Sequence, residues 1–137
     1  MAIELSGCVI LLQVFDMPTS LRFYRDLLGF RVVERSGPDD RCGWAWLRRG
    51  DVEVMLNTAY EDDRRPPQPD PAHLASHDDT TLYFGCPDVD GAHAELRARG
   101  IPTGAPTTTR YGMRQLHFHD PDGYGLCLQW KADSPAA

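Results

Sequence analysis

The chain has 137 residues, of which 42% are apolar and 25% are charged, a balance that indicates a soluble globular protein of one domain or of two small modules sharing a core. A net charge of −6 disfavours nucleic acid as a partner, because that partner requires a basic surface. No apolar run approaches the ~20 residues that cross a bilayer, and no basic leader comes first, so we expect a cytoplasmic protein without a membrane partner. The four cysteines are scattered, form no C-x-x-C pair and are expected to stay reduced.

The first part of the chain predicts a strand, a helix and three further strands. Residues 9–14 form a continuous apolar run, which is typical of a buried strand. Asp16 is placed to cap a helix, Pro18 fits its first turn, and Gly29 is suited to end it. The three strands that follow are expected over residues 30–35, 43–48 and 51–57.

Residues 58–80 interrupt this pattern. They are rich in proline and charge and show neither a helical nor a strand period, so we predict a linker or a long surface loop. His73 and His77 lie in this stretch and are expected to be solvated.

The same order of elements then returns. Residues 81–86 predict a strand, Asp88 is placed to begin a second helix, and Gly100 to end it. The helix cap and the closing glycine are 13 positions apart in the first copy and 12 in the second. The later hairpin turns, at Gly50 and Gly123, follow those closing glycines by 21 and 23 positions. Such agreement over a whole unit indicates an internal repeat.

The chain is therefore predicted to be α+β, with two tandem βαβββ modules at about residues 5–57 and 81–131. The second module closes with a hairpin within residues 110–130, where apolar and polar residues alternate on both sides of a Pro- and Gly-containing turn at residues 120–123.

Three segments and the repeat itself resemble the vicinal oxygen chelate superfamily, which includes glyoxalases, extradiol dioxygenases and bleomycin-resistance proteins. The run DMPTSLRFYRDLLGF is similar to the first-helix signature of that family. The run GWAWLRRGDVEVML resembles a strand hairpin of bleomycin-resistance proteins, and the runs around residues 120–123 resemble the closing hairpin. The resemblance covers about residues 5–131. It implies a single domain in which two curved mixed sheets enclose a cleft and the helices cover the outer faces.

The resemblance also implies where the metal-dependent members would bind a divalent ion. Their four inner-face ligand positions, usually His, Glu or Gln, correspond here to Val9, Thr81, Cys127 and either Glu53 or Met55. At most one of these side chains is a hard ligand, whereas Mg²⁺, Mn²⁺ and Fe²⁺ prefer carboxylate and imidazole. His117 and His119 share a strand face but have no third ligand in view. We therefore expect no metal and no other cofactor.

Strand parity predicts a different lining for the cleft. Because Ala45 and Leu47 are the smaller aliphatic residues expected under a helix, Trp44 and Trp46 are predicted to face the cleft. The alternative is that these indoles fill the core or a dimer interface. The same parity applied to every strand gives an aromatic, soft and mostly uncharged set of ligand-binding candidates: Trp44, Trp46, Glu53, Met55, Tyr83, Gln115, His117, Cys127 and Gln129.

This lining suits a planar, partly hydrophobic ligand held by stacking, and Glu53 beside two indoles would receive a cation. We therefore predict a non-catalytic, homodimeric small-molecule binding protein similar to bleomycin-resistance proteins, which sequesters an aromatic or cationic compound. Two alternatives stay open. One is a glyoxalase- or dioxygenase-like enzyme whose metal site has moved to Glu53 and His117, and the other is a metal-free enzyme or ligand sensor on the same fold. No catalytic set is visible, and Cys127 beside His117 is the one pairing open to activation.

Overall fold

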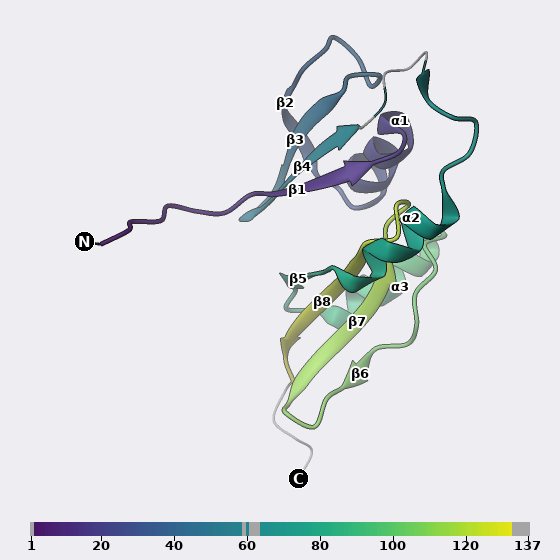
Figure 1. Cartoon of the computed structure of the whole chain (residues 1–137). Helices are drawn as coiled ribbons and strands as arrows, with labels where there is room; N and C mark the ends of the chain where they lie inside the picture. Colours follow the sequence, from purple (N-terminus) through teal and green to yellow (C-terminus); the bar gives the residue numbers. More distant parts are fainter. Residues whose placement is uncertain (1, 59, 61–63, 133–137) are drawn as a thin grey trace. The chain divides into compact units, whose positions relative to one another are not determined.

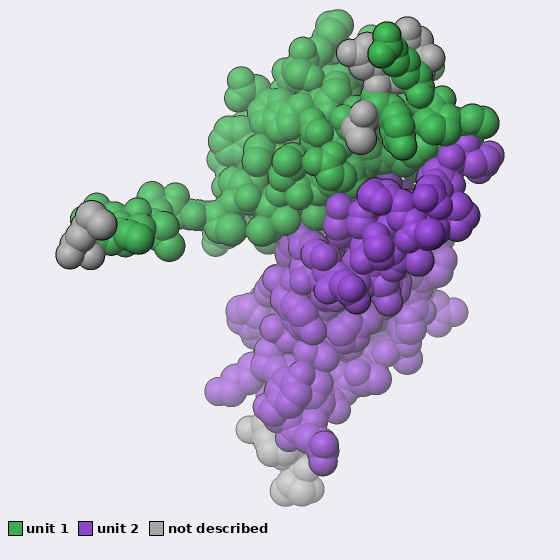
Figure 2. Space-filling model, viewed as in Figure 1, with its two compact units in different colours: residues 1–67 green, residues 68–137 purple. Residues whose placement is uncertain are grey.

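The structure, a computed structural model of the chain, describes residues 2–58, 60 and 64–132 (Figure 1). The chain divides into two compact units, residues 1–67 and 68–137, called unit 1 and unit 2 (Figure 2). No helix in the described part of the chain is long and apolar enough to cross a membrane. The elements follow in the order β1 (Ile10–Val14), α1 (Met17–Leu21), the π-helical η1 (Arg22–Leu27), β2 (Arg31–Arg35), β3 (Trp44–Arg49), β4 (Val52–Thr58), α2 (Pro71–Ser76), the 3-10 turn η3 (His77–Asp79), β5 (Thr81–Gly85), α3 (Val89–Ala98), β6 (Thr107–Thr108), β7 (Met113–His119) and β8 (Gly125–Lys131).

Unit 1 contains a four-stranded mixed sheet in the order β1-β4-β3-β2. β1 runs parallel to β4, whereas the β4–β3 and β3–β2 pairs are antiparallel. Parallel neighbours cannot be joined by a tight hairpin, so the chain forms its helix and two further strands before β4 returns to the side of β1. This arrangement confirms the predicted βαβββ order of the first module.

One face of the unit 1 sheet is packed under the first helix. Ala45 and Leu47 of β3 and Val54 of β4 are fully buried, as are Leu21 of α1 and Tyr24 of η1. Burial of a large aliphatic or aromatic side chain contributes roughly 1.5–3 kcal/mol to folding, so this layer is the core of the unit. The predicted parity of β3 is correct, and its alternate residues lie on the opposite face of the sheet.

The first helix begins as predicted but winds differently after one turn. The Asp16 carboxylate caps α1 by accepting a hydrogen bond from the Thr19 backbone N–H at 3.2 Å. After Leu21 the helix widens into η1, which ends with the Leu28 N–H donating to the Phe23 carbonyl at 2.9 Å. A π-helical turn inserts an extra residue and rotates the later side chains. Leu28, which follows this turn, is only half-buried.

Unit 2 repeats the topology of unit 1, with the strand order β5-β8-β7-β6, a parallel β5–β8 pair and antiparallel remaining pairs. The Asp88 carboxylate caps α3 by accepting from the Gly91 N–H at 2.9 Å. α3 lies against β7 and β8, and its Leu96 is buried together with Leu116 and Leu126 of those strands. The equal strand order of the units confirms the predicted tandem repeat. The predicted βαβββ order includes a strand between α3 and β7, but the position of the two-residue β6 was not predicted.

The stretch predicted as a linker or surface loop, residues 58–80, contains the helix α2 and the turn η3. Asp70 caps α2 by accepting a hydrogen bond from the Ala72 backbone N–H at 3.0 Å. Pro71 occupies the first helical position, where its missing N–H has no helical partner to lose. Both signals are present in the sequence, but the many neighbouring prolines and charges concealed a helix of one and a half turns.

The α2–η3 segment is held against the β7–β8 turn of its own unit. Nδ1 of His77 lies 2.7 Å from the Asp122 carbonyl oxygen, and the His77 ring stacks on Tyr124 with centroids 4.0 Å apart. Gly123 adopts φ 88°, and a Cβ at this position would collide with the Leu74 carbonyl oxygen. His77 therefore anchors the segment, and the expectation that it is solvated was wrong.

Candidate functional site

In unit 1, the predicted ligand-binding side chains lie together on the sheet face turned away from the helix. The strand register places Trp46 opposite Met55 and Trp44 opposite Asn57. All four are half-buried, in contrast to the fully buried residues that alternate with them. Glu53 lies two residues before Met55 and so shares its face. We call this surface, with Arg48 added, the unit 1 face: Trp44, Trp46, Arg48, Glu53 and Met55.

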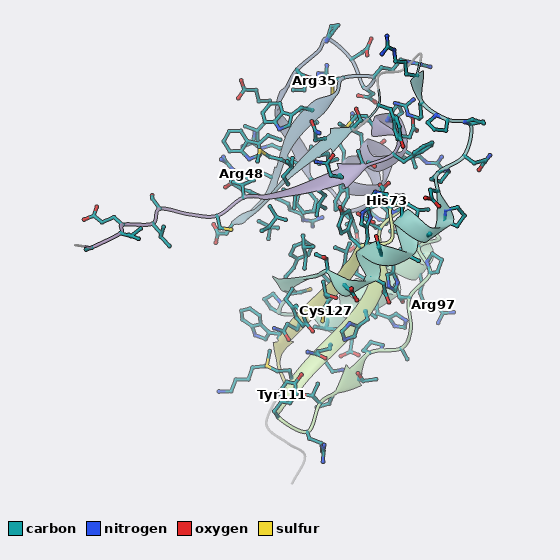
Figure 3. All side chains as sticks on the ribbon, in the orientation of Figure 1. Arg35, Arg48, His73, Arg97, Tyr111 and Cys127 are labelled. Carbon is teal, nitrogen blue, oxygen red and sulfur yellow. The ribbon has the colours of Figure 1, made fainter. Side chains whose placement is uncertain are left out.

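Arg48, labelled in Figure 3, was not singled out from the sequence, yet it contacts two of the predicted residues. Its guanidinium carbon lies 5.6 Å from the centroid of the Trp46 ring, within the range of a cation–π contact. Its Nε and Nη2 donate to Oε1 of Glu53 at 2.8 and 2.6 Å. The position expected to receive a ligand cation is thus already engaged by an arginine of the chain. The signal in the sequence was the turn at Gly50, which makes Arg48 and Glu53 cross-strand neighbours.

The Trp46 indole is also distinguished by its nitrogen. The Nε1–H group is buried and has no hydrogen-bond acceptor among the residues that the structure describes. A buried donor without an acceptor costs about 1–3 kcal/mol. A ligand oxygen that reached this N–H would remove that cost, so Trp46 offers a polar contact as well as a stacking surface.

In unit 2, the five predicted residues also share the face turned away from α3. The register places Cys127 of β8 between Tyr83 of β5 and His117 of β7, and Gln115 opposite Gln129. Tyr83 and His117 are exposed, whereas Gln115 and Cys127 are buried. We call this surface the unit 2 face: Tyr83, Gln115, His117, Cys127 and Gln129.

A chain of hydrogen bonds runs across the unit 2 face. Gln115 Nε2 donates to Gln129 Oε1 at 2.9 Å, and Gln115 Oε1 lies 3.3 Å from His117 Nε2. The Tyr111 hydroxyl, 3.5 Å from Gln115 Nε2, extends the chain toward the β6–β7 turn. The Tyr83 ring stands edge-on to the His117 ring, with centroids 6.5 Å apart. Strand parity did not predict Tyr111, because this residue lies in a turn.

Cys127, labelled in Figure 3, is the most buried residue of this face. Its side chain is fully buried, and its Sγ lies 3.7 Å from His117 Nε2. Burial raises the pKa of the Cys127 thiol, and the hydrogen bond from the Leu116 backbone lowers it by a smaller amount. A thiol that is buried and protonated is a poor nucleophile, because the thiolate is the reactive form.

The side chains at the metal positions implied by the resemblance do not suit a hard divalent ion. In unit 1, Val9 is apolar and the Glu53 carboxylate is bonded to Arg48. In unit 2, Thr81 offers a neutral hydroxyl and Cys127 a buried thiol. Within the described ranges, no three His, Cys, Asp or Glu side chains are grouped closely enough to hold a metal ion. The donor set therefore does not fit the ion of the metal-dependent members.

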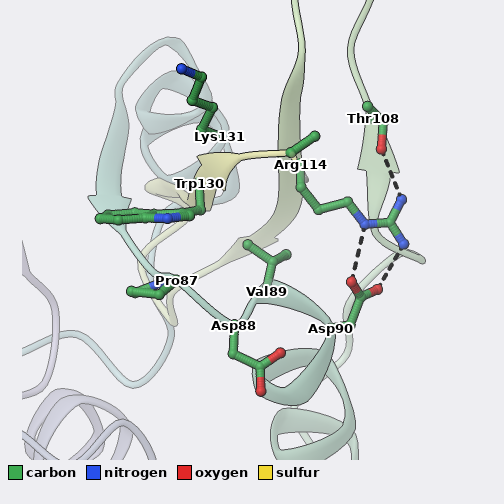
Figure 4. Close-up of a pocket in the computed structure, with 9 residues that line it drawn as sticks. Pro87, Asp88, Val89, Asp90, Thr108, Arg114, Trp130 and Lys131 are labelled. Carbon is green, nitrogen blue, oxygen red and sulfur yellow. Dashed lines mark hydrogen bonds and ion pairs between the residues drawn. The ribbon is translucent and has the colours of Figure 1, made fainter. Parts of the chain in front are cut away.

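A separate groove of about 300 Å³ opens on the opposite side of the unit 2 sheet, next to the start of α3 (Figure 4). Trp130, 47% exposed, and Arg114 face each other in the β7–β8 register and line it. Arg114 Nη2 donates to Asp90 at 2.7 Å and its Nη1 to the Thr108 hydroxyl at 3.2 Å. The hydrogen bond from Arg114 lowers the pKa of Asp90. Lys131 and Asp88 also line the groove, so it offers a ligand charged and polar groups beside the indole of Trp130.

Two tandem βαβββ units, each with one face under a helix, define a protein of the glyoxalase fold. Residues 9–128 match the family described as the Glyoxalase/Bleomycin resistance protein/Dioxygenase superfamily. Because the match covers most of the chain, the protein belongs to this superfamily, and the predicted resemblance is confirmed. No curated protein matches its sequence.

Solved structures of this superfamily align along nearly the whole chain. A glyoxalase/bleomycin resistance protein/dioxygenase from Nocardioides has a TM-score of 0.72 at 19% identity and covers 100% of this chain and 91% of its own. TioX from Micromonospora sp. ML1 has a TM-score of 0.72 at 19% identity, covering 92% and 98%. TnmS3, an antibiotic binding protein from Streptomyces sp. CB03234, has a TM-score of 0.69 at 25% identity, covering 96% and 99%. The first two likenesses show the fold alone.

Proposed function

We propose that this protein binds a planar aromatic small molecule and holds it without metal chemistry. The observation that carries the proposal is that each unit, taken by itself, turns aromatic, soft and polar side chains to the sheet face opposite its helix. Two indoles and a thioether occupy the unit 1 face, and a phenol ring, two amides and an imidazole occupy the unit 2 face. Aromatic walls stack on a planar ligand, and a few fixed polar groups orient it.

The family relationship supports sequestration of the ligand. The solved relative TnmS3 is an antibiotic binding protein and is 25% identical over 96% of this chain. Extended to this chain, that function makes planar aromatic antibiotics the first class of ligand to test. The chemistry of Thr81 and Cys127 supports binding over metal-assisted catalysis, because neither is a preferred ligand for Mg²⁺, Mn²⁺ or Fe²⁺.

The Arg48–Glu53 pair decides which ligand charge the unit 1 face accepts. The pair is neutral as a whole, and the Glu53 side chain is 22% exposed. A neutral planar ligand leaves it intact, whereas a cationic ligand contacts the Glu53 carboxylate only by displacing the guanidinium. We therefore place neutral and weakly cationic aromatic compounds ahead of strongly cationic ones.

We also propose that the protein is a homodimer. Ile3 and Leu5 are 79% and 87% exposed, and Ile10 and Leu11 of the edge strand β1 are 41% and 46% exposed. Exposed apolar side chains on an edge strand and on the segment that leads into it are typical of a surface that another chain covers. Pairing about a two-fold axis is the commonest way in which identical chains cover such a surface.

A thermal-shift screen tests the binding function, because a ligand at 100 times its Kd stabilises the folded state by about 2.7 kcal/mol. The panel contains bleomycin-type compounds, neutral planar aromatics and planar aromatic cations, with Mn²⁺ and Zn²⁺ screened separately. An aromatic compound is expected to raise the Tm of the wild-type protein and of Trp130→Leu, but much less that of Trp46→Leu. Stabilisation by a metal ion alone would contradict the proposal and favour the enzyme alternative.

A further inference from the structure

Gln115 fixes the orientation of its two neighbours on the unit 2 face. Only 6% of the residue is exposed, and both the amino group and the carbonyl oxygen of its side-chain amide have neighbours within hydrogen-bond distance. The Nε2 amino group donates to Gln129 Oε1 at 2.9 Å, which places the Oε1 carbonyl on the side of His117. A carbonyl oxygen only accepts hydrogen bonds, so the imidazole nitrogen that faces it must carry a proton.

This contact favours one tautomer of the His117 ring. With the Gln115 amide oriented in this way, the contact at 3.3 Å is a hydrogen bond when Nε2 carries the proton, and in that tautomer Nδ1 holds a lone pair. The residue is exposed while Nε2 is turned toward Gln115 and Cys127, so Nδ1 is the ring nitrogen left for a ligand. In the described part of the chain, Nδ1 has no hydrogen-bond partner of its own.

The same logic applies to Gln129 at the other end of the chain of hydrogen bonds. Its Oε1 accepts from Gln115, which leaves its amino group as the free end of the amide. Among the described side chains, none accepts a hydrogen bond from that amino group. The unit 2 face thus presents one acceptor, His117 Nδ1, and one donor, the Gln129 amino group, on either side of the buried Gln115.

We propose that His117 Nδ1 recognises a hydroxyl group on the aromatic ligand, and that the ligand class is hydroxylated aromatic compounds with a further oxygen acceptor for Gln129. The proposal rests on the proposed binding function and narrows its ligand. The phenol-type hydroxyl donates a hydrogen bond to Nδ1, while the exposed Tyr83 ring beside His117 supplies apolar contact. A ligand without the hydroxyl leaves the Nδ1 lone pair unpaired once water is displaced, which lowers its affinity.

The tautomer also determines what Cys127 does. Because Nε2 is the nitrogen closest to the thiol, at 3.7 Å, and already carries a proton, it does not take the thiol proton as a general base. The His117–Cys127 pair is therefore part of a binding surface and does not act as a nucleophile–base pair.

The tautomer is tested by ¹⁵N NMR of the histidine rings at about pH 7.5, where an unperturbed imidazole is neutral. His117→Phe assigns the resonance, and His119→Phe is the control, because His119 lies on the same strand and is paired instead with Asp78. We expect the spectrum of the Nε2–H form. The Nδ1–H form would overturn the proposal, because the side facing the ligand would then be a donor.

The ligand class is tested by calorimetry with a naphthol and its methyl ether, which differ only in the hydroxyl proton. One hydrogen bond worth about 1 kcal/mol predicts roughly five-fold tighter binding of the naphthol. That preference should vanish in His117→Phe and persist in His119→Phe. Equal binding of the two probes to the wild-type protein would overturn the hydroxyl assignment alone. If neither probe binds, and no other planar aromatic compound binds either, both the hydroxyl assignment and the proposed function are overturned.

Discussion

The guanidinium of Arg48 donates two hydrogen bonds to the same carboxylate oxygen of Glu53, from Nε at 2.8 Å and from Nη2 at 2.6 Å. The two residues face each other across the β3–β4 pair, and Arg48 also covers the Trp46 ring. At the unit 1 face, the same arginine therefore controls both the access of a ligand cation to Glu53 and the access of a ligand ring to the Trp46 indole. A ligand that displaces the guanidinium exposes both a carboxylate and an aromatic surface.

Removal of the guanidinium is expected to turn this face into a better site for cations. Arg48→Gln should bind a planar aromatic cation such as proflavine two- to five-fold more tightly than the wild-type protein, which corresponds to roughly 0.4–1 kcal/mol for a partly exposed charge. The gain should decrease as salt is added. Glu53→Gln should weaken binding of the same cation.

Two controls separate charge from shape in this experiment. Arg97→Gln removes the same charge from α3 of unit 2 at an exposed residue and should leave the affinity unchanged. A neutral planar aromatic of the same size should respond much less than proflavine to Glu53→Gln. Equal responses of the charged and neutral compounds would show that Glu53 does not contact the ligand.

Tryptophan fluorescence reports which face the ligand occupies. Of the three tryptophans, two lie on the unit 1 face and Trp130 lines the groove on the opposite side of the unit 2 sheet. A planar ligand should quench the emission, and Trp130→Phe should keep that quenching. Trp44→Leu and Trp46→Leu should each weaken binding about five-fold, since an aromatic pair contributes roughly 1 kcal/mol beyond its burial. Unchanged affinity in both folded variants would place the site elsewhere.

Metal retention tests whether the side chains at the superfamily's metal-ligand positions bind a divalent ion. After incubation with Zn²⁺, Mn²⁺ or Fe²⁺ and desalting, the protein should keep much less than one equivalent, because Val9, Thr81 and Cys127 offer no carboxylate or imidazole. Elemental analysis of the desalted sample measures this directly. One equivalent retained by the wild-type protein and lost in Glu53→Ala or His117→Ala would establish the relocated metal site.

The parts of the fold that could be read from the sequence depend on local periodicity. Two-residue alternation in β3 correctly predicted which of Trp46 and Leu47 lies under the helix, because a strand turns successive side chains to opposite faces. Glycines at similar spacing identified the turns, and Gly50 and Gly123 do adopt positive φ. The repeat then followed from counting alone.

The remaining features depend on contacts that the period of a strand or helix does not predict. Arg48 has the sequence context of a solvated strand residue; the turn at Gly50 indicates its pairing with Glu53, but its place over Trp46 is seen only in the structure. The helix α2 is stabilised by the β7–β8 turn through the contact of His77 with Asp122, 45 residues further along the chain. A single-sequence pattern carries no information on a partner so far away. Short helices owe most of their stability to tertiary packing, which explains why α2 was missed.

The apolar N-terminal segment provides a test of the proposed dimer. Sedimentation at micromolar concentration should give twice the chain mass of 15.4 kDa. Replacing the exposed Ile3 and Leu5 by lysine should shift the mass toward one chain, because burying two uncompensated charges at an interface is unfavourable. Ser6→Lys adds a charge at a polar neighbour and serves as the control. A wild-type protein that sediments as one chain would contradict the proposal.

An ion pair links the loop between β2 and β3 to η1, and its contribution to the stability of the fold should depend on pH. Arg25 donates from Nη1 and Nη2 to the two carboxylate oxygens of Asp40 at 2.8 and 2.9 Å. The Arg25 hydrogen bonds lower the pKa of Asp40, and a weaker attraction from Arg35 acts in the same direction. A carboxyl group whose pKa is lower in the folded state stabilises that state above its unfolded pKa, near 3.9, and loses the effect as the pH falls through the folded value.

Asp40→Asn should therefore lower the free energy of unfolding by about 0.5–1 kcal/mol at neutral pH, the range expected for a bidentate but partly exposed pair. Urea denaturation at a series of pH values measures the difference from the wild-type protein. That difference should be constant between about pH 5 and 8 and should shrink as the wild-type carboxyl group is protonated below about pH 4. Glu34→Gln removes a charge from an exposed residue of β2 and should have little effect at any pH. If the difference in free energy of unfolding between Asp40→Asn and the wild type stayed constant below about pH 4, the substitution would act through packing and not through the ion pair.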